Sequence, residues 1–79
     1  MKVVVKYFAS LREARGCNQE ELEIEPASVC SLYVQLAQQY SFKLPSSIVR
    51  FAVNGEFVEP DTLLQQGDQI AFIPPVAGG

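Results

Sequence analysis

The groups of this 79-residue chain that are suited to chemistry lie at its C-terminal end, where residues 74–79 read Pro-Pro-Val-Ala-Gly-Gly. Gly78 and Gly79 have no Cβ, so this backbone is narrow enough to thread a closed channel and flexible enough to meet an active site. The α-carboxylate of Gly79 is ionised at neutral pH and is a poor electrophile until another enzyme activates it, most simply as an acyl-adenylate made from ATP. The sequence therefore predicts a carried substrate whose reactive group is its own C-terminus.

Two prolines separate this end from the rest of the chain. Pro74 and Pro75 cannot donate hydrogen bonds to a sheet, so strand pairing should end before them and the chain should leave in extended form. Six extended residues reach about 20 Å at most. We therefore expect a folded domain over residues 1–73 and an extended tail over residues 74–79. The alternative is a frayed terminus, since chain ends are often glycine-rich and poorly ordered.

The remaining composition leaves little other chemistry. The chain has no histidine, which removes imidazole general bases, Ser–His and Cys–His dyads and histidine metal ligands. Cys17 and Cys30 form no CxxC pair and are expected to be reduced thiols, with a role in sulfur relay as the alternative. We expect this chain to bind no cofactor and no metal.

Charge and hydropathy exclude further classes of function. A net charge of −3 argues against nucleic acid as a partner, because its phosphates require a basic surface. No apolar run approaches the roughly 18–20 residues that span a bilayer, so we expect no membrane partner and a cytoplasmic location. A hydrophobic fraction of 48% supplies the core of one small domain.

The elements that must position the tail begin with a strand and a short helix. The strand is predicted over residues 2–8, with Val3, Val5 and Tyr7 pointing into the core. Ser10 and Glu13 fit a capping box, with Ser10 as the N-cap, and Gly16 stands where a helix end is expected. One or two helical turns should therefore follow the first strand.

A second strand is predicted at residues 20–25, where glutamates alternate with apolar residues and Pro26 follows. Leu22 and Ile24 should point inward, and Glu21, Glu23 and Glu25 outward. The glutamates form either a solvated sheet face or an acidic docking surface for a basic partner.

The main helix should start at the N-cap Ser28 and run to about Tyr40. Its apolar residues recur at the 3.6-residue spacing of a helix that lies on a sheet, and they are Val29, Leu32, Tyr33, Leu36, Ala37 and Tyr40.

Three more strands are predicted in the second half of the chain. After a polar connection over residues 42–47, residues 48–53 and 56–58 form a hairpin around a type I′ turn at Asn54-Gly55. Leu63 and Leu64 should tuck a turn beneath the sheet. Gly67-Asp68 then turns the chain into a last strand over residues 69–73. The architecture is thus α+β, a mixed sheet with one main helix on one face and its most apolar strands, the first and last, central.

Over its whole length the sequence resembles the family of small subunits of molybdopterin synthase, sulfur carriers with the ubiquitin-like β-grasp fold. The resemblance rests on residues 8–13 with Gly16, on the hairpin at residues 53–55, on Gly67-Asp68 leading into residues 72–75, and above all on residues 76–79.

The resemblance implies a mechanism and a set of partners. An ATP-dependent activating enzyme would adenylate Gly79, and a sulfur donor, ultimately a persulfide, would leave a thiocarboxylate there. The large synthase subunit would receive the tail and pass the sulfur to a cyclic pterin precursor, which builds the dithiolene of molybdopterin. Two carriers and two large subunits form a heterotetramer in the family. ATP would be used by the activating enzyme and not bound by this chain.

Docking on these partners should use the tail and the sheet face that the helix leaves open. The tail residues expected to contact a partner are Pro74, Pro75, Val76, Ala77 and Gly78. The candidates on the open face are Val4 and some of Phe51, Phe57, Ala71 and Ile73, and each of them has an ordinary core role as its alternative.

Three other functions are compatible with the sequence. A sulfur carrier of thiamine thiazole synthesis shares the fold and the Gly-Gly end, but those carriers are generally shorter and lack the segment from Leu11 to Gly16. A ubiquitin-like modifier would be conjugated to lysines. A plain interaction module would carry an inert tail.

Overall fold

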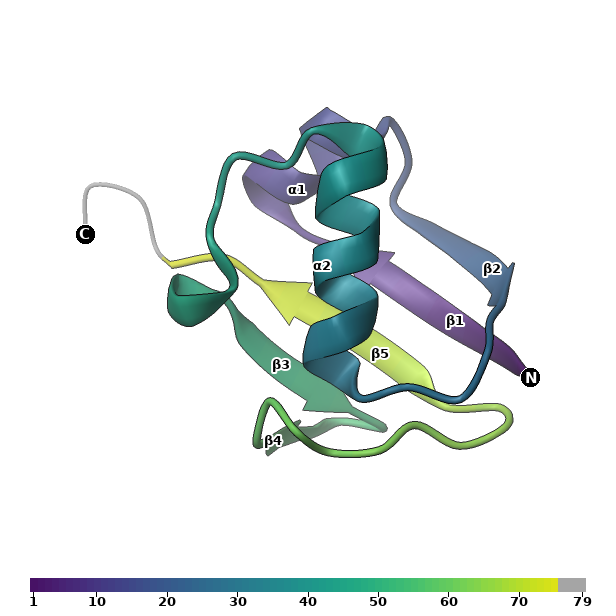
Figure 1. Cartoon of the computed structure of the whole chain (residues 1–79). Helices are drawn as coiled ribbons and strands as arrows, with labels where there is room; N and C mark the ends of the chain where they lie inside the picture. The colour runs from purple at the N-terminus through teal and green to yellow at the C-terminus, as the bar shows by residue number, and fades with distance from the viewer. Residues whose placement is uncertain (76–79) are drawn as a thin grey trace.

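The computed structural model describes residues 1–75 as a mixed five-stranded sheet with one long helix across one face (Figure 1). The strands lie in the order β2-β1-β5-β3-β4, with β1 and β5 parallel and the other neighbours antiparallel. The strand bounds are β1 Lys2–Tyr7, β2 Gln19–Glu23, β3 Arg50–Val53, β4 Glu56–Val58 and β5 Gln69–Ile73. The helices are α1 Ala9–Arg15 and α2 Val29–Tyr40, with a 3-10 turn, η1, at Ser46–Ile48. The predicted α+β architecture is confirmed, and the first and last strands lie inside the sheet.

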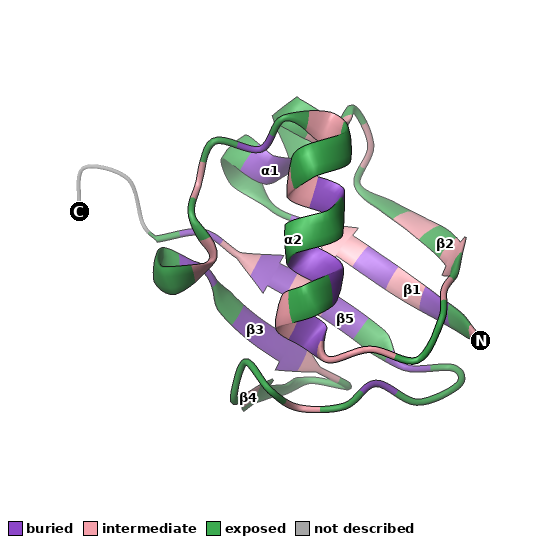
Figure 2. Ribbon diagram, in the orientation of Figure 1, coloured by how far each residue is buried: buried purple, intermediate pink, exposed green. Residues whose placement is uncertain are grey.

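The helix α2 has the cap and the apolar stripe that its sequence predicts. The hydroxyl of Ser28 accepts a 3.1 Å hydrogen bond from the amide of Ser31, which satisfies one of the free donors at the helix start. The residues that α2 buries are Val29, Leu32, Tyr33 and Leu36. Figure 2 shows the same division along the helix, buried toward the sheet and exposed on the outer side. The stripe is therefore the contact between helix and sheet.

The core lies between α2 and the sheet face that it covers. Alternate residues of the two central strands point into it: Val3, Val5, Tyr7, Ile70 and Phe72. The ring of Tyr33 on α2 meets the ring of Phe72 edge to face, with 5.1 Å between the ring centroids. Burying one such aromatic side chain stabilises a fold by about 1.5–3 kcal/mol, so this contact is a main attachment of the helix to the sheet.

The helix α1 starts earlier than the capping box predicts. Its N-cap is Phe8, whose carbonyl accepts from the amides of Leu11 and Arg12, and no side chain caps the helix. Ser10 lies inside the first turn, so the prediction of Ser10 as N-cap was wrong. The chain enters α1 through Ala9 at φ +50°, a left-handed conformation that non-glycine residues rarely adopt. The predicted end at Gly16 is confirmed, since Gly16 has φ +87°.

The hairpin between β3 and β4 is the predicted type I′ turn. Asn54 and Gly55 both have positive φ, +54° and +87°, as this turn requires. The side chain of Asn54 also joins the hairpin to the start of β5: its Nδ2 donates to Asp68 Oδ1 at 3.0 Å, and its Oδ1 accepts from the amide of Gln69 at 2.9 Å. The turn thus fixes β5, the strand that leads into the tail.

Several local predictions were wrong in detail. Leu64 is buried in the core as expected, but Leu63 is 73% exposed. Ile48 belongs to η1 and not to a strand, because β3 starts only at Arg50. The strand β2 ends at Glu23, although Ile24 still packs against the core. These differences lie at the ends of elements and in the connection between β4 and β5, where local pattern is weakest.

Within residues 1–75, neither helix is long and apolar enough to cross a membrane.

Candidate functional site

The root of the tail is the end of β5, which carries the chain out of the sheet beside β1 and β3 (Figure 1). Pro74 is buried, and Pro75 is exposed. The other predicted tail residues, Val76, Ala77, Gly78 and Gly79, lie outside the described residues. The site that the structure does describe is therefore the surface from which residues 76–79 continue.

An apolar groove lies on the open sheet face, opposite α2. Ala52 on β3 is flanked by Phe57 on β4 and Ala71 on β5 in the sheet register, so the three lie side by side across the strands. With Ile73 they line a groove of about 290 Å³. Phe57 is 59% exposed, which is unusual for an aromatic side chain of a small domain. The predicted apolar patch on the open face is present at Phe57, Ala71 and Ile73.

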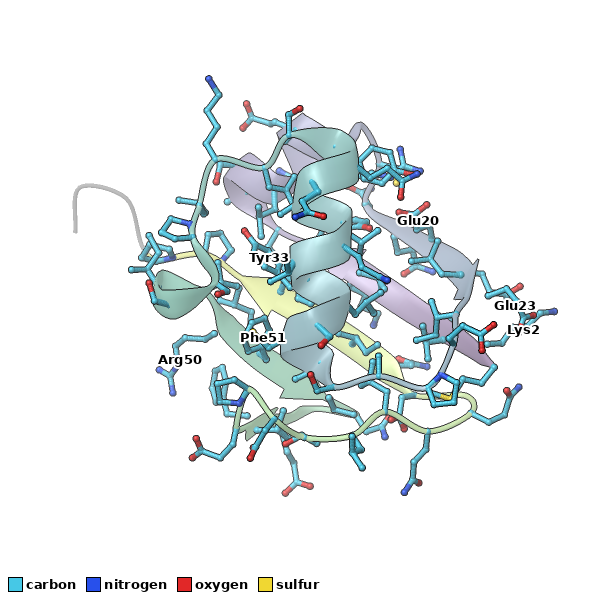
Figure 3. The ribbon with its side chains drawn as sticks, viewed as in Figure 1. Lys2, Glu20, Glu23, Tyr33, Arg50 and Phe51 are labelled. Carbon is cyan, nitrogen blue, oxygen red and sulfur yellow. The ribbon has the colours of Figure 1, made fainter. Side chains whose placement is uncertain are left out.

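One candidate for this patch, Phe51, has instead its alternative role in the core. Phe51 is only 3% exposed and points into the core under α2, where its ring meets Tyr33 and Phe72. Figure 3 shows Phe51 beside Tyr33 beneath the helix, whereas its neighbour Arg50 points away. The register explains this difference, because Phe51 pairs with Phe72 and both lie on the covered face. Val4, the remaining candidate, is half-buried.

Sequence reasoning missed Phe8, which follows β1 directly. Phe8 is 43% exposed and lines the open-face groove together with Ile73. It also lines a second groove, of about 650 Å³, between α1 and the root of the tail. The residues that line this second groove are Phe8, Ala9, Ser10, Glu13, Ile73, Pro74 and Pro75. The available signal was the alternation along β1, which places Phe8 opposite to the buried Tyr7.

Charged side chains surround the open-face groove. The guanidinium of Arg50 lies 4.2 Å from the centre of the Phe57 ring, a cation–π contact on its rim. Lys6 lines the groove on the β1 side. Farther along the open face, Lys2 Nζ lies 3.8 Å from a carboxylate oxygen of Glu21. An apolar centre with a polar rim is the usual anatomy of a protein–protein interface.

Acidic residues of β2 are partly neutralised within the molecule. The N-terminal ammonium lies 2.8 Å from Glu23 and lowers the pKa of that carboxyl below its usual range. Figure 3 shows Glu23 and Lys2 at the same corner of the sheet. The glutamates predicted as a solvated face or an acidic docking surface are exposed at Glu21, Glu23 and Glu25, but Glu20 is not.

Glu20 is instead the centre of a polar cluster, which sequence reasoning missed. Its carboxylate accepts hydrogen bonds of 2.7 and 2.6 Å from Arg15 and of 2.6 Å from the hydroxyl of Tyr7. The two bonds from Arg15, the largest cause, hold the pKa of Glu20 below its usual range. Burial, with a smaller contribution from the carboxylate of Glu20, raises the pKa of Tyr7. Tyr7 therefore stays a neutral donor.

The cysteines do not assemble a site with other ligating groups. Cys17 and Cys30 are both free and half-buried. Among residues 1–75, no group of three Cys, Asp or Glu side chains is placed to hold a metal ion.

Comparison with known proteins identifies relatives over nearly the whole chain. The profile of the ThiS family matches residues 5–79. The molybdopterin synthase sulfur carrier subunit of Mycobacterium tuberculosis is 42% identical, over 100% of this chain and 99% of that protein.

Solved structures agree with this likeness. A putative molybdopterin converting factor subunit 1 from Pyrococcus furiosus has a TM-score of 0.81 at 36% identity, covering 96% of this chain and 99% of that one. A chain in the complex of subunits 1 and 2 of molybdopterin-converting factor from Helicobacter pylori has a TM-score of 0.69 at 25% identity, with full coverage of both chains. Small archaeal modifier protein 1 from Methanosarcina acetivorans has a TM-score of 0.75 at 29% identity, over 99% and 96%.

Proposed function

The chain belongs to the ThiS family, and from that premise we propose that it is the sulfur carrier subunit of a molybdopterin synthase, with the ubiquitin-like β-grasp fold. The observation that carries this proposal is full-length likeness to proteins of that name at up to 42% identity. The structure supports it with a folded domain whose last strand leads directly into Pro74 and Pro75. It is thus one part of a two-subunit complex, as subunit 1 is in the Helicobacter pylori structure.

The reactive group of this carrier is the carboxylate of Gly79. In the activating enzyme, a carboxylate oxygen attacks the α-phosphorus of ATP, pyrophosphate leaves, and the carbonyl carbon becomes electrophilic. The terminal sulfur of a persulfide then displaces AMP, and a thiol cleaves the resulting acyl disulfide. A thiocarboxylate remains on Gly79. Because these reactions use ATP and thiols, we propose that the carrier acts in the cytoplasm.

The folded domain contributes position to this chemistry. The chain has no histidine, and we expect the general acids and bases to come from the partners. Docking of the open-face groove on the large subunit leaves the tail to enter the active site of that subunit, where the sulfur passes to a cyclic pterin precursor. Phe57, Ala71 and Ile73 supply the apolar contact, and holding the carrier there turns sulfur transfer into a step within one complex.

The first test is the intact mass of the chain after incubation with ATP, an activating enzyme and a persulfide donor. The expected result is the mass change for one oxygen replaced by sulfur, localised by fragmentation to Gly79. A chain that ends at Ala77 is the control and should stay unchanged. No mass change with competent partners, and none in protein isolated from its own cells, would contradict the carrier function.

A second candidate, the ubiquitin-like modifier, is favoured by the likeness to the Methanosarcina acetivorans modifier protein. It would join Gly79 to lysine side chains through isopeptide bonds. Tryptic peptides that carry the C-terminal residues on lysine would support it, and their absence from cells that contain the thiocarboxylate would exclude it. The carrier of thiamine synthesis is tested in the same way, by asking whether a thiazole synthase or the large synthase subunit binds the charged chain.

A further inference from the structure

The groove between α1 and the root of the tail has no role in the function proposed above, yet it is lined by Pro74 and Pro75, which lead into the C-terminal residues. One wall is formed by Pro74 and Pro75, and the other by Phe8 and the first turns of α1. Glu13 is the one charged residue that lines it. Because Phe8 and Ile73 line both grooves, the open-face groove and this one form a continuous surface around the base of the tail.

The helix that makes this wall needs support from the rest of the fold. The helix α1 has only seven residues, and a helix of that length is unstable in isolation. It buries a single residue, Leu11. Its entry through Ala9 at φ +50° is a strained conformation that the surroundings must maintain. Leu11 attaches the first half of α1 to the core, so a second contact with the rest of the fold is needed near the end of this helix.

That second contact is made by Arg15, the last residue of α1. Its guanidinium binds the carboxylate of Glu20 on β2 with a two-bond fork at 2.7 and 2.6 Å. The same guanidinium lies 4.1 Å from the centre of the Tyr40 ring at the end of α2, and Tyr7 of β1 donates to Glu20 from below. The cluster thus joins α1 to two strands and to the main helix.

We propose that the groove between α1 and the tail root is a docking subsite for the protein that receives the tail, and that Arg15 and Glu20 are positioning residues that keep this subsite preformed. The occupant is an apolar side chain of that protein, presented beside a basic group that meets Glu13. This inference rests on the proposed function.

Geometry identifies the occupant. Since Pro74 and Pro75 are a wall of the groove, a protein that encloses the residues after Pro75 must lie against it. The lining is otherwise apolar or uncharged, so an apolar side chain is the complementary group, and the carboxylate of Glu13 calls for a cation. When α1 is already ordered, binding does not have to supply the entropic cost of ordering this wall of the groove. Loosening α1 should therefore weaken docking and leave the chemistry at Gly79 unchanged.

The test measures single-turnover sulfur transfer from the thiocarboxylated carrier over a range of large-subunit concentrations. Arg15→Gln should raise the half-saturating concentration about tenfold, equivalent to about 1.4 kcal/mol, and leave the rate at saturation within about twofold. Arg15→Lys, which keeps the charge but loses the fork, should lie between Arg15→Gln and wild type. Arg12→Gln is the matched control on the same helix, because Arg12 does not line the groove, and it should behave as wild type.

A second variant does not depend on the stability of α1. Glu13→Lys reverses the charge in the groove at an exposed position and should raise the half-saturating concentration by a similar factor with an unchanged melting temperature. Glu56→Lys makes the same change of net charge on β4, outside both grooves, and should have little effect.

The possible outcomes distinguish the positioning role of Arg15, the docking subsite and the proposed function. A lower melting temperature for Arg15→Gln with a wild-type half-saturating concentration would show a purely structural cluster and overturn the positioning role. Wild-type behaviour of Glu13→Lys would overturn the subsite. Failure of the wild-type carrier itself to transfer sulfur would instead contradict the proposed function, and the inference would fall with it.

Discussion

The two faces of the sheet use neighbouring residues of the same strands for opposite purposes. On β5, Phe72 is fully buried under α2, while the next residue, Ile73, is half-exposed at the root of the tail. On β3, Phe51 packs in the core and Ala52 lines the open-face groove. The covered face supplies the stability of the domain, and the open face supplies the surface that we propose for docking on partners. One sheet can therefore serve both purposes because consecutive side chains point to opposite sides.

The small size of the chain explains why stability depends on one face of the sheet. At about 0.05–0.15 kcal/mol per residue, a domain of this length has a free energy of unfolding of only about 4–12 kcal/mol. A single helix covers one face, so apolar residues on the other face stay available without contributing much to stability. Their variants should accordingly act on binding, whereas variants of the covered face should act on folding.

The largest expected effect on function without an effect on folding comes from deletion of Gly78 and Gly79. We expect complete loss of thiocarboxylate formation, because the reactive carboxylate is displaced from its position beyond Ala77. The melting temperature should not change, since the core lies entirely within the described domain. Mass spectrometry measures thiocarboxylate formation, and thermal unfolding measures the stability of the domain. Substantial sulfur transfer by this variant would contradict the role of the tail.

Phe72→Ala and Ile73→Ala compare the two faces at adjacent positions. Phe72→Ala should lower the free energy of unfolding by about 3–5 kcal/mol, because it removes a fully buried ring that touches Tyr33. Ile73→Ala should cost much less stability and should weaken binding to the large subunit. Denaturant unfolding and calorimetric titration measure the two effects. Equal losses of stability would show that the division of the faces is wrong.

Phe57→Ser and Val34→Ser compare two exposed apolar residues on opposite sides of the molecule. Phe57 is 59% exposed on the open face, and Val34 is 41% exposed on the outer side of α2. Phe57→Ser should weaken binding of the large subunit about tenfold, as expected for an aromatic anchor worth more than about 1 kcal/mol. Val34→Ser should leave the affinity unchanged. The same affinity for both variants would place the docking surface elsewhere.

Glu20→Gln gives the smallest expected effect, a change in the dependence of stability on pH. The pKa of Glu20 in the folded domain lies below its usual value of 4.5, so its contribution is fully present above pH 4.5 and is lost as the pH falls through the folded pKa. Wild type should therefore lose more stability on acidification than Glu20→Gln. Parallel pH profiles for the two proteins would contradict this account. Melting temperatures between pH 3 and 7 measure it.

Much of this fold could be predicted from local pattern. The alternation along β1, the stripe of α2 and the Asn54-Gly55 turn are each encoded within a few neighbouring residues, and each is present as predicted. The apolar patch on the open face was also predicted at Phe57, Ala71 and Ile73, because the helix leaves one side of the alternation uncovered.

The features that sequence reasoning missed depend on contacts between residues that are distant in the sequence. The sequence left Phe51 open between the two faces, because the face of β3 is set by its pairing with β5, which no local signal reveals. Ser10 has the residue type of an N-cap, but the helix starts at Ala9 and its N-cap is Phe8. The bond between Tyr7 and Glu20 joins different strands, so a run of glutamates in the sequence gave no sign that one of them is anchored.

The parallel pairing of β1 with β5 has a consequence for synthesis of the chain on the ribosome. The strand β1 is synthesised first, but its parallel partner β5 is synthesised last. The centre of the sheet therefore cannot form until residues 69–73 have emerged from the ribosome. Such long-range closure slows folding relative to local structure. A nascent or truncated chain that lacks β5 therefore has neither a complete domain nor a C-terminal end that follows one.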